Sequence, residues 1–396
     1  MSDREINVVI VGTSIAGMTA AKAVAALSKQ GYPNLRVTTI DKNEYYYHAI
    51  GAPRAVVDKE FGKQLLLPVK NLLQSFELDP ESPKHRFIHA SVVSVNKHSV
   101  VLSDGQNIVY DYLVLATGAR NKLPAHIQGP TFADAKQQMA RVYDNVSKAK
   151  NILIVGGGPV GVEIAGEIAY AYKDKSVTLV HGAERLLPPN FKPGLSNGAV
   201  HKLERLGVKV VLNEKIDIPK DVLFDCSVRP LSLVGSSGAS YSSDLQILTT
   251  GITFESDYLH GLETDLKVSL RQPNGSIKVK STLQLDCDAL PNVFVPGDVN
   301  SLPAGAKYAV KAKEQATSVG NNLVLMIKQG YDEDNKKMPA LLDYTGGEMN
   351  MTLVPIGKEL GVFQALGIAF GKSFVGDFLS KIKSKDYFLS KFASEF

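Results

Sequence analysis

The feature that most constrains the fold of this chain is a pattern that occurs twice along it. Each copy consists of an apolar strand, a glycine-rich turn, a helix and a second strand. In the first copy these elements are residues 6–11, 12–17, about 17–29 and 36–40. In the second copy they are residues 151–155, 156–161, about 160–172 and 176–180. Strands that are apolar on both faces are typical of parallel sheets covered by helices. The duplicated unit therefore predicts an α/β fold with two similar parallel sheets.

The turn of the first copy has the spacing of a phosphate-binding loop. Gly12 and Gly17 stand where a GxGxxG motif requires a tight turn and close helix-to-strand packing, whereas Ser14 replaces the middle glycine. The helix N-terminus beyond this turn offers free N–H groups and a partial positive charge to a pyrophosphate. Asp41 ends the second strand, where a carboxylate can accept hydrogen bonds from a ribose diol. These residues predict a dinucleotide site; the alternative is a turn that binds no phosphate.

The turn of the second copy carries the complete motif, with Gly156, Gly158 and Gly161 at the three required positions. His181 stands at the end of the following strand, where an acid would favour NAD by repelling a 2′-phosphate. Arg185 is close enough in sequence to meet a 2′-phosphate, but a solvated surface arginine is an equally good interpretation. The sequence therefore predicts a nicotinamide dinucleotide site that accepts NADPH, with NADH as an alternative donor.

Two later motifs separate a flavoprotein from a simple dehydrogenase. Residues 115–119 (LATGA) end a strand at a sharp crossover, and residues 249–251 (TTG) repeat that theme. Residues 292–298 (NVFVPGD) end a strand at Asp298, whose carboxylate could hold a hydroxyl of a flavin's ribityl chain. We therefore expect FAD in the first site and NADH or NADPH in the second.

With these motifs in order, the chain resembles the two-dinucleotide-binding flavoproteins over nearly its whole length. It is most similar to the apoptosis-inducing-factor family, in particular to the ferroptosis-suppressor group and its fungal relatives. The stretches that carry this likeness are residues 156–167 (GGGPVGVEIAGE), 177–181 (VTLVH) and 383–388 (KSKDYF). The resemblance implies a glutathione-reductase-like α/β fold with two Rossmann-like dinucleotide-binding domains and a small C-terminal α+β domain.

The length of 396 residues suits several domains. We expect an FAD-binding domain in two parts, an NAD(P)H-binding domain inserted between them, and a C-terminal domain. The expected bounds are 1–120 and 253–333 for the FAD domain, 121–252 for the NAD(P)H domain and 334–396 for the C-terminal domain. The charged run 332–337 is interpreted as a solvated linker.

The resemblance also implies which residues bind the cofactors. Those expected around FAD are Gly12, Ser14, Ala16, Gly17, Asp41, Lys42, Arg54, Lys59, Val93, Thr117, Gly118, Asp298 and Tyr308. Those expected around NADH or NADPH are Gly156, Gly158, Pro159, Val160, Gly161, His181, Arg185 and Gly251. Val93 should reach the adenine through its backbone, and the helix that starts near Tyr308 should direct its N-terminus at the flavin ring.

Two residues are candidates for the catalytic step, which needs no catalytic cysteine or histidine because the flavin does the chemistry. Glu163 lies one turn past the second glycine loop, where it either faces the nicotinamide or is an exposed helix glutamate. Lys383 is either the cationic partner of Glu163 near the flavin or part of a solvated, lysine-rich face.

Composition excludes several other classes of protein. The two cysteines, Cys226 and Cys287, are far apart and match neither a CxxC pair nor a metal-ligand spacing. Electrons on a flavin would therefore leave by a route other than protein thiols, and we expect no metal. The net charge of +4 mildly favours anionic partners without predicting specific nucleic-acid binding.

The termini and the apolar C-terminal segment bear on location. We expect no N-terminal targeting signal, no myristoylation because residue 2 is serine, and no membrane-spanning stretch. Residues 353–378 are apolar and glycine-interrupted, and lysines follow them. They form either a quinone entrance whose basic edge rests on a membrane, or a domain-closing element or dimer contact. The expected location is cytoplasmic or peripheral on a membrane, such as the mitochondrial surface or a lipid droplet, as a monomer or homodimer.

The leading hypothesis is an FAD-dependent NAD(P)H:quinone oxidoreductase that passes a hydride from the nicotinamide to the flavin and then to a ubiquinone-like acceptor. One alternative hands the electrons to a ferredoxin. Another is a redox-sensing cell-death effector that binds NAD(P)H, turns over slowly and signals through partners or DNA, although the small net charge argues against DNA.

Overall fold

The computed structural model describes residues 4–75, 78, 81–82, 84–303, 305, 307–330, 338–347 and 351–390. The segment interpreted as a linker, 332–337, lies outside these residues. Packing divides the chain into two compact units, each made of several segments. Unit 1 comprises Met1–Tyr46, Pro68–Arg120 and Thr253–Met349, and unit 2 comprises Tyr47–Leu67, Asn121–Ile252 and Asn350–Phe396. The domain bounds expected from the sequence stay a prediction.

Unit 1 is built around a mostly parallel sheet in the order β19-β10-β1-β2-β6-β5. Its strands are β1 (Ile6–Val11), β2 (Leu35–Asp41), β5 (Glu81–Ser82), β6 (His85–His89), β10 (Tyr112–Leu115) and β19 (Val293–Phe294). Only β5 pairs antiparallel, with β6. Residues 8–11 of β1 are all buried, which agrees with an apolar strand covered on both faces.

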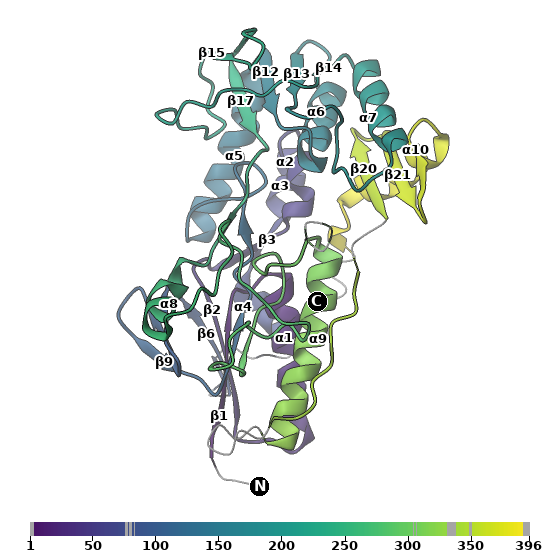
Figure 1. Ribbon diagram of the computed structural model, residues 1–396. Helices are drawn as coiled ribbons and strands as arrows, with labels where there is room; N and C mark the ends of the chain where they lie inside the picture. The colour runs from purple at the N-terminus through teal and green to yellow at the C-terminus, as the bar shows by residue number, and fades with distance from the viewer. Residues whose placement is uncertain are drawn as a thin grey trace. The chain divides into compact units, whose positions relative to one another are not determined.

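Two helices pack side by side in unit 1: α1 (Ile15–Ala25) and α9 (Ala309–Gln329), as Figure 1 shows. A Cβ added to Gly320 of α9 would lie 2.5 Å from the Cβ of Ala23, so small residues allow the two helices to approach closely. The helix expected near Tyr308 is therefore confirmed as α9, although its first residue is Ala309.

The rest of unit 1 is formed by small elements around the main sheet. An antiparallel meander consists of β7 (Val92–Val95), β8 (Ser99–Leu102) and β9 (Asn107–Val109). The other elements are the paired strands β11 (Ala119–Arg120) and β18 (Thr253–Phe254), the helices α4 (Val69–Ser75) and α8 (His260–Leu266), and the short 3-10 turns η1 (Ala26–Gln30) and η3 (Asp257–Leu259). One core joins the sheet to the meander and to α8, with Val95, Leu113 and Leu262 among its members.

Unit 2 repeats the same topology with a parallel sheet in the order β14-β13-β12-β17. Its strands are β12 (Asn151–Val155), β13 (Ser176–Val180), β14 (Lys209–Val211) and β17 (Leu245–Leu248), and its larger helices are α5 (Phe132–Lys148), α6 (Pro159–Ala171) and α7 (Pro193–Arg205). In both units the strand that precedes the glycine turn lies inside the sheet, with the next strand on one side and a later strand on the other. The two-fold repeat of an α/β dinucleotide-binding fold is thus confirmed.

Three further groups of elements complete the fold. One is a hairpin formed by β15 (Leu231–Val234) and β16 (Ser240–Ser243). Near the start of unit 2 lie β3 (Tyr45–Tyr47), β4 (Leu66–Pro68), the turn η2 (Ala49–Gly51), α2 (Ala52–Ala55) and α3 (Lys59–Gln64). At the C-terminal end, an antiparallel sheet of β20 (Thr352–Ile356), β21 (Leu360–Ala365) and β22 (Ile368–Phe370) packs against α10 (Phe374–Asp386), in yellow in Figure 1.

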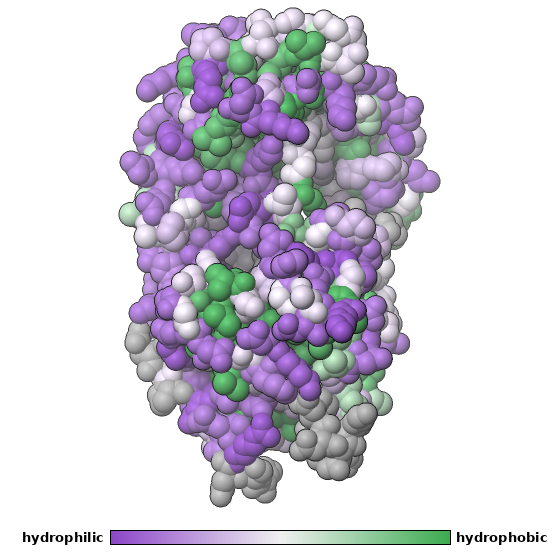
Figure 2. Space-filling model, turned by 60° about the vertical axis from the view of Figure 1, so that its left-hand side comes forward, coloured by the Kyte–Doolittle hydropathy of each residue, from purple (hydrophilic) through white to green (hydrophobic). Residues whose placement is uncertain are grey.

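The surface is mixed in character. On the face drawn in Figure 2, hydrophobic side chains form separate patches among hydrophilic ones. Among the described residues, no helix is both long enough and apolar enough to cross a membrane.

Candidate functional site

The first glycine turn is tight enough to require glycine at two positions. Gly12 has φ +102°, and a Cβ there would lie 2.3 Å from the carbonyl oxygen of Ala116. A Cβ on Gly17 would lie 1.8 Å from the carbonyl oxygen of Gly12. Ser14 is exposed and directly precedes α1, so the middle of the loop is open at the helix N-terminus, where a pyrophosphate binds. The loop therefore keeps the geometry of the motif despite its serine.

Asp41 is held in place at the end of β2 by the glycine loop itself. Its Oδ2 accepts from the Thr13 amide (2.7 Å) and the Thr13 hydroxyl (2.8 Å), and its Oδ1 accepts from the Asn43 amide (2.9 Å). A carboxylate has about four acceptor positions, so one is left for a ribose hydroxyl. The neighbouring Lys42 is half-buried and forms an ion pair with Glu255, with Nζ 3.5 Å from Oε2.

Two other predicted segments converge on this loop. The close approach of Gly12 to Ala116 brings the crossover at Thr117 and Gly118 beside it. Similarly, a Cβ on Gly297 would lie 3.1 Å from the Cβ of Ala16, so the turn that carries Asp298 packs against the start of α1. The structure thus brings together three motifs that are far apart in the sequence, namely residues 12–17, 115–119 and 292–298.

Inside this cluster, some predicted side chains are already engaged. The Thr117 hydroxyl donates to the Glu255 carbonyl at 2.7 Å and lies 2.9 Å from the Tyr258 hydroxyl. Burial raises the pKa of the Asp298 carboxyl, and the ammonium of Lys307 opposes that rise. Lys307 also donates to the Asp298 carbonyl at 2.7 Å, which fixes the turn. Lys307 therefore holds the backbone of the turn that carries Asp298.

Val93 and Tyr308 have geometries that agree with their expected roles. The pairing of β7 with β8 shifts register between Val92 and Ser94, so the ladder skips Val93, whose side chain is 53% exposed. A backbone freed from the ladder is suited to pair with an adenine. Tyr308 is the N-cap of α9, in an extended conformation, so the amides of the first turn follow it directly.

Arg54 and Lys59 belong to unit 2, whereas the other residues expected around FAD belong to unit 1. The Arg54 guanidinium donates to both carboxylate oxygens of Glu167 at 2.8 Å, and both side chains are buried. Lys59 is exposed and forms an ion pair with Asp144 at 3.1 Å. Their contacts with FAD stay a prediction, and the contacts that the structure shows are with protein groups.

The second glycine loop repeats the geometry of the first. Gly156 has φ +117°, and a Cβ there would lie 2.7 Å from the Thr249 hydroxyl oxygen. A Cβ on Gly161 would lie 2.0 Å from the Gly156 carbonyl oxygen. Gly158 is the N-cap of α6, Pro159 and Val160 form its first turn, and Gly251 (φ +75°) is exposed. Thr249 donates to the Gly156 carbonyl at 2.8 Å, which ties this loop to the TTG motif.

His181 belongs to the loop itself. Its Nδ1 accepts from the Gly157 amide at 3.1 Å, and burial lowers the pKa of the imidazole. His181 thus occupies the strand-end position at which an acid would repel a 2′-phosphate. The Arg185 side chain is 32% exposed and lies 3.4 Å from Glu184, so the guanidinium is half-solvated next to the loop.

The two candidate catalytic residues form a close ion pair within unit 2. The Lys383 ammonium donates to Glu163 Oε1 at 2.7 Å and to the Leu353 carbonyl at 3.0 Å. Glu163 is only 6% exposed, which rules out the exposed helix glutamate. Burial raises the pKa of its carboxyl, while Lys383 opposes that rise. The expected partnership of Glu163 and Lys383 is confirmed; their catalytic role stays a prediction.

A second set of contacts, which was not among the residues predicted from the sequence, lies one helical turn further along. The Tyr387 hydroxyl donates to Glu167 Oε1 at 2.7 Å, and His48 Nε2 donates to the Tyr387 carbonyl at 3.0 Å. Tyr387 is fully buried and has φ +51°, a conformation that costs energy in a non-glycine residue. The overlooked signal was the i,i+4 spacing of Glu163 and Glu167, matched by the same spacing of Lys383 and Tyr387.

Close backbone packing explains how the helices α6 and α10 meet. A Cβ on Gly166 of α6 would lie 2.7 Å from the Cα of Ile356 in β20. This glycine therefore lets the C-terminal sheet rest directly on α6. Since α10 packs on the same sheet, Lys383 and Tyr387 reach Glu163 and Glu167.

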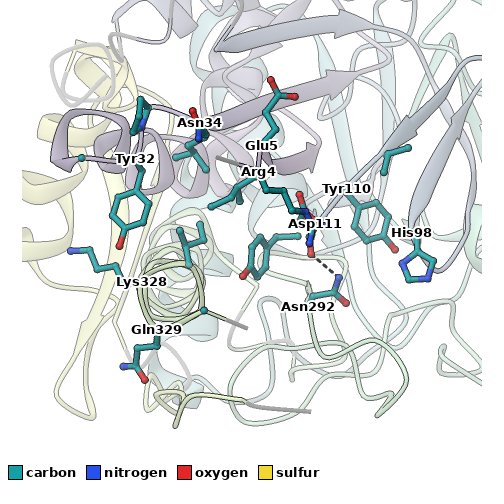
Figure 3. Close-up of a pocket in the computed structure, with 18 residues that line it drawn as sticks. Arg4, Glu5, Tyr32, Asn34, His98, Tyr110, Asp111, Asn292, Lys328 and Gln329 are labelled. Atoms are coloured by element: carbon teal, nitrogen blue, oxygen red, sulfur yellow. Dashed lines mark hydrogen bonds and ion pairs between the residues drawn. The ribbon is translucent and has the colours of Figure 1, made fainter. Parts of the chain in front are cut away.

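Unit 1 has a cavity of about 880 Å³ that is lined by no residue of the first glycine loop. It lies at the amino ends of β1, β2 and β10, whereas dinucleotides bind at the carboxyl ends of parallel strands. In Figure 3, Asn292 donates to the Asp111 carbonyl at 2.7 Å, and Tyr32, His98 and Tyr110 also line the cavity. This cavity is therefore distinct from the site that the first glycine loop defines.

Metal and thiol chemistry find no support in the described residues. Among them, no group of three or more histidine, cysteine or acidic side chains could hold a metal ion. Both cysteines are described, and both are free. Burial raises the pKa of the Cys226 thiol to about 12, so that thiol is not a nucleophile at neutral pH.

The described residues fit both dinucleotides. The glycines of each loop occupy positions that a Cβ would fill, each loop leads into a helix N-terminus, and Asp41 retains an acceptor for a ribose. Gly12, Gly17, Asp41 and Asp298 would hold FAD, and the loop of unit 2 would hold the nicotinamide dinucleotide. The fold and the two loops define a flavoprotein reductase with two dinucleotide-binding domains.

The chain belongs to the pyridine nucleotide-disulphide oxidoreductase family, whose model matches residues 6–316. It is 27% identical to apoptosis-inducing factor homolog A of Dictyostelium discoideum over 410 residues, which cover 98% of this chain and 91% of that protein. It is 28% identical to ferroptosis suppressor protein 1 of Xenopus tropicalis over 402 residues, which cover 98% of this chain and 95% of that protein. The expected likeness to the apoptosis-inducing-factor family is confirmed.

Solved structures agree on the fold. The sulfide:quinone oxidoreductase of Aquifex aeolicus matches with a TM-score of 0.68 at 16% identity, covering 98% of this chain and 91% of that one. The protein is accordingly an NAD(P)H-dependent, FAD-containing oxidoreductase.

One prediction follows from the tightness of the first loop. Gly17→Ala places a methyl group against the Gly12 carbonyl and forces the loop to shift. Overpacking of this kind costs about 1–3 kcal/mol, equivalent to roughly 5- to 150-fold weaker binding of FAD. The flavin absorbance per protein after purification, and the Kd from titration of stripped protein with FAD, measure the effect. Gly261→Ala in α8, where the nearest atom is 3.6 Å away, is the matched control and should keep its FAD.

Proposed function

We propose that the protein is an NAD(P)H:quinone oxidoreductase. Bound FAD supplies the chemistry, which is acceptance of a hydride from the nicotinamide and delivery of the electrons to a second substrate. The chain's own residues bind both dinucleotides through the two glycine loops and place the Glu163–Lys383 pair one turn beyond the second loop.

The observation that carries this proposal is the state of the two cysteines. Many oxidoreductases of similar architecture pass electrons to a protein dithiol, which requires a neighbouring pair of cysteines. Here Cys226 is buried and Cys287 is partly buried, both are free, and they are 61 positions apart in the sequence (287 − 226). A small-molecule acceptor, of which a ubiquinone-like quinone is the natural example for a flavin, is therefore favoured over a thiol.

The experiment that tests this function separates the two half-reactions. The holoprotein is reduced without oxygen by NADH or by NADPH, and the flavin is then reoxidised by a soluble ubiquinone analogue, by a ferredoxin or by oxygen. We expect fast bleaching with a nicotinamide and reoxidation that is fastest with the quinone. Faster reoxidation by ferredoxin would assign the protein to the ferredoxin reductases. Slow reoxidation by every acceptor, with a persistent charge-transfer band, would indicate a redox-sensing effector.

The choice of nicotinamide gives a further prediction. Because His181, and not an acid, stands directly at the end of β13, we propose that Arg185 binds the 2′-phosphate of NADPH. Arg185→Ala should then raise the KM for NADPH about tenfold, the value of one lost charge-assisted contact, and leave the KM for NADH unchanged. Arg141→Ala, a surface arginine of α5 in the same unit, is the control. An equal effect on the KM values of both nicotinamides would mean that Arg185 is a solvated surface residue that does not bind the 2′-phosphate.

A further inference from the structure

The C-terminal helix α10 packs with its small residues inward and its large apolar residues outward. Gly376, Ser380 and Ser384 are buried. A Cβ on Gly376 would lie 2.7 Å from the carbonyl oxygens of Gly361 and Phe370, so the helix backbone rests directly on the C-terminal sheet. This arrangement is the reverse of a globular amphipathic helix, which buries its large apolar side chains.

The outward face of α10 carries three large apolar side chains one turn apart. Phe374 is 81% exposed, Phe378 is 62% exposed and Ile382 is 54% exposed. Each precedes a buried small residue by two positions, which is about half a turn around the helix. Exposed apolar side chains clustered on one helix face mark a surface that binds a membrane or another molecule.

The charges on the same face are positive. Lys381 and Lys385 are exposed beside Phe378 and Ile382. The helix's two carboxylates are engaged elsewhere: Asp377 accepts from the buried Lys202 at 2.5 Å, and Asp386 accepts from the backbone amide of Phe388 at 3.0 Å. The outward face is thus apolar and cationic, without an acidic side chain of α10 to neutralise it.

We propose that this face of α10 docks on an anionic lipid surface. Large apolar side chains flanked by lysines are the recognition chemistry of a helix that lies in the interface of a bilayer. Two copies of the chain would bring the lysines of both faces together, which like-charge repulsion disfavours. A membrane with acidic headgroups satisfies both the apolar and the cationic parts. The proposal goes beyond the proposed function, because docking depends on this surface and not on the electron acceptor.

The test is flotation of the holoprotein with vesicles of phosphatidylcholine alone or with phosphatidylserine. We expect flotation with the phosphatidylserine vesicles, weakened by salt. Replacing Phe374, Phe378 and Ile382 with serine should lower binding about tenfold or more for each residue. Lys381→Gln with Lys385→Gln should lower binding to the acidic vesicles about 30-fold and leave binding to phosphatidylcholine unchanged. All variants should retain FAD and the native unfolding midpoint, since the replaced side chains are exposed.

Several results would overturn the proposal. One is that the native protein does not float with acidic vesicles. Another is that the serine variants float as well as the native protein. A third is a native dimer, measured by light scattering, that the same serine substitutions dissociate while vesicle binding is absent; the face would then be covered by a second copy. None of these results bears on the quinone assay, so failure of docking and failure of the proposed function can be told apart.

Discussion

Replacing Glu167 with alanine is expected to destabilise the protein by about 3–5 kcal/mol, because it leaves the buried Arg54 guanidinium without its counter-ion. Both side chains are almost fully buried, at 4% and 1% exposure, so water cannot replace the lost carboxylate. Tyr387 loses its acceptor in the same variant. Urea unfolding of the holoprotein at a fixed FAD concentration measures the change.

Two comparison variants identify the cause of that loss. Tyr387→Phe removes one hydroxyl and leaves the Arg54–Glu167 pair intact, so it should cost about 1–3 kcal/mol. Replacing Arg54 and Glu167 together with methionine removes both charges and should recover much of the loss from Glu167→Ala. If the double variant is as unstable as the sum of the single ones, the pair does not act as a unit.

The second large effect is expected on catalysis. Glu163→Gln keeps the size of the side chain and removes its charge, leaving the Lys383 ammonium without a carboxylate. If the pair faces the nicotinamide, the rate of flavin reduction should fall about 10²-fold while FAD content is unchanged. Stopped-flow measurement of flavin bleaching under anaerobic conditions gives this rate. If the variant's flavin bleaches at the native rate, Glu163 is not a catalytic residue.

Lys383→Met should change the pH dependence in a defined direction. Burial raises the pKa of the Glu163 carboxyl, and Lys383 partly reverses that rise. Without Lys383 the pKa rises further, so the carboxylate takes up a proton at a higher pH. If the ionised form is the active one, the acid limb of the pH–rate profile for flavin reduction moves to higher pH.

A matched control is available on the same helix. Asp377→Asn removes the charge partner of the buried Lys202, again within unit 2 and again on α10. It should lower stability without changing the pH profile or the bleaching rate per bound flavin. A similar fall in rate in this variant would assign the effect of Glu163→Gln to helix packing.

Much of the two loops could be predicted from local sequence. Apolar runs such as residues 6–11 and 151–155 form strands at those bounds, and the glycines at 12, 17, 156 and 161 occupy positions where a Cβ would strike backbone or a side chain. These features depend on residues within one strand–turn–helix unit, so a short stretch of sequence contains all of their causes. The pairing of Glu163 with Lys383 was also expected, but from family likeness and not from local pattern.

The sequence by itself thus determined the repeated α/β units, the two dinucleotide loops and the absence of a dithiol. Only the tertiary structure decided that Arg54 pairs with Glu167, that Tyr387 and His48 complete that cluster, and that α10 turns its phenylalanines outward. The reason is that burial and partnership depend on residues up to hundreds of positions apart. The spacing of Phe374, Phe378 and Ile382 alone indicates one apolar helix face, but the close fit of Gly376 against β21 and β22 determines which way that face points.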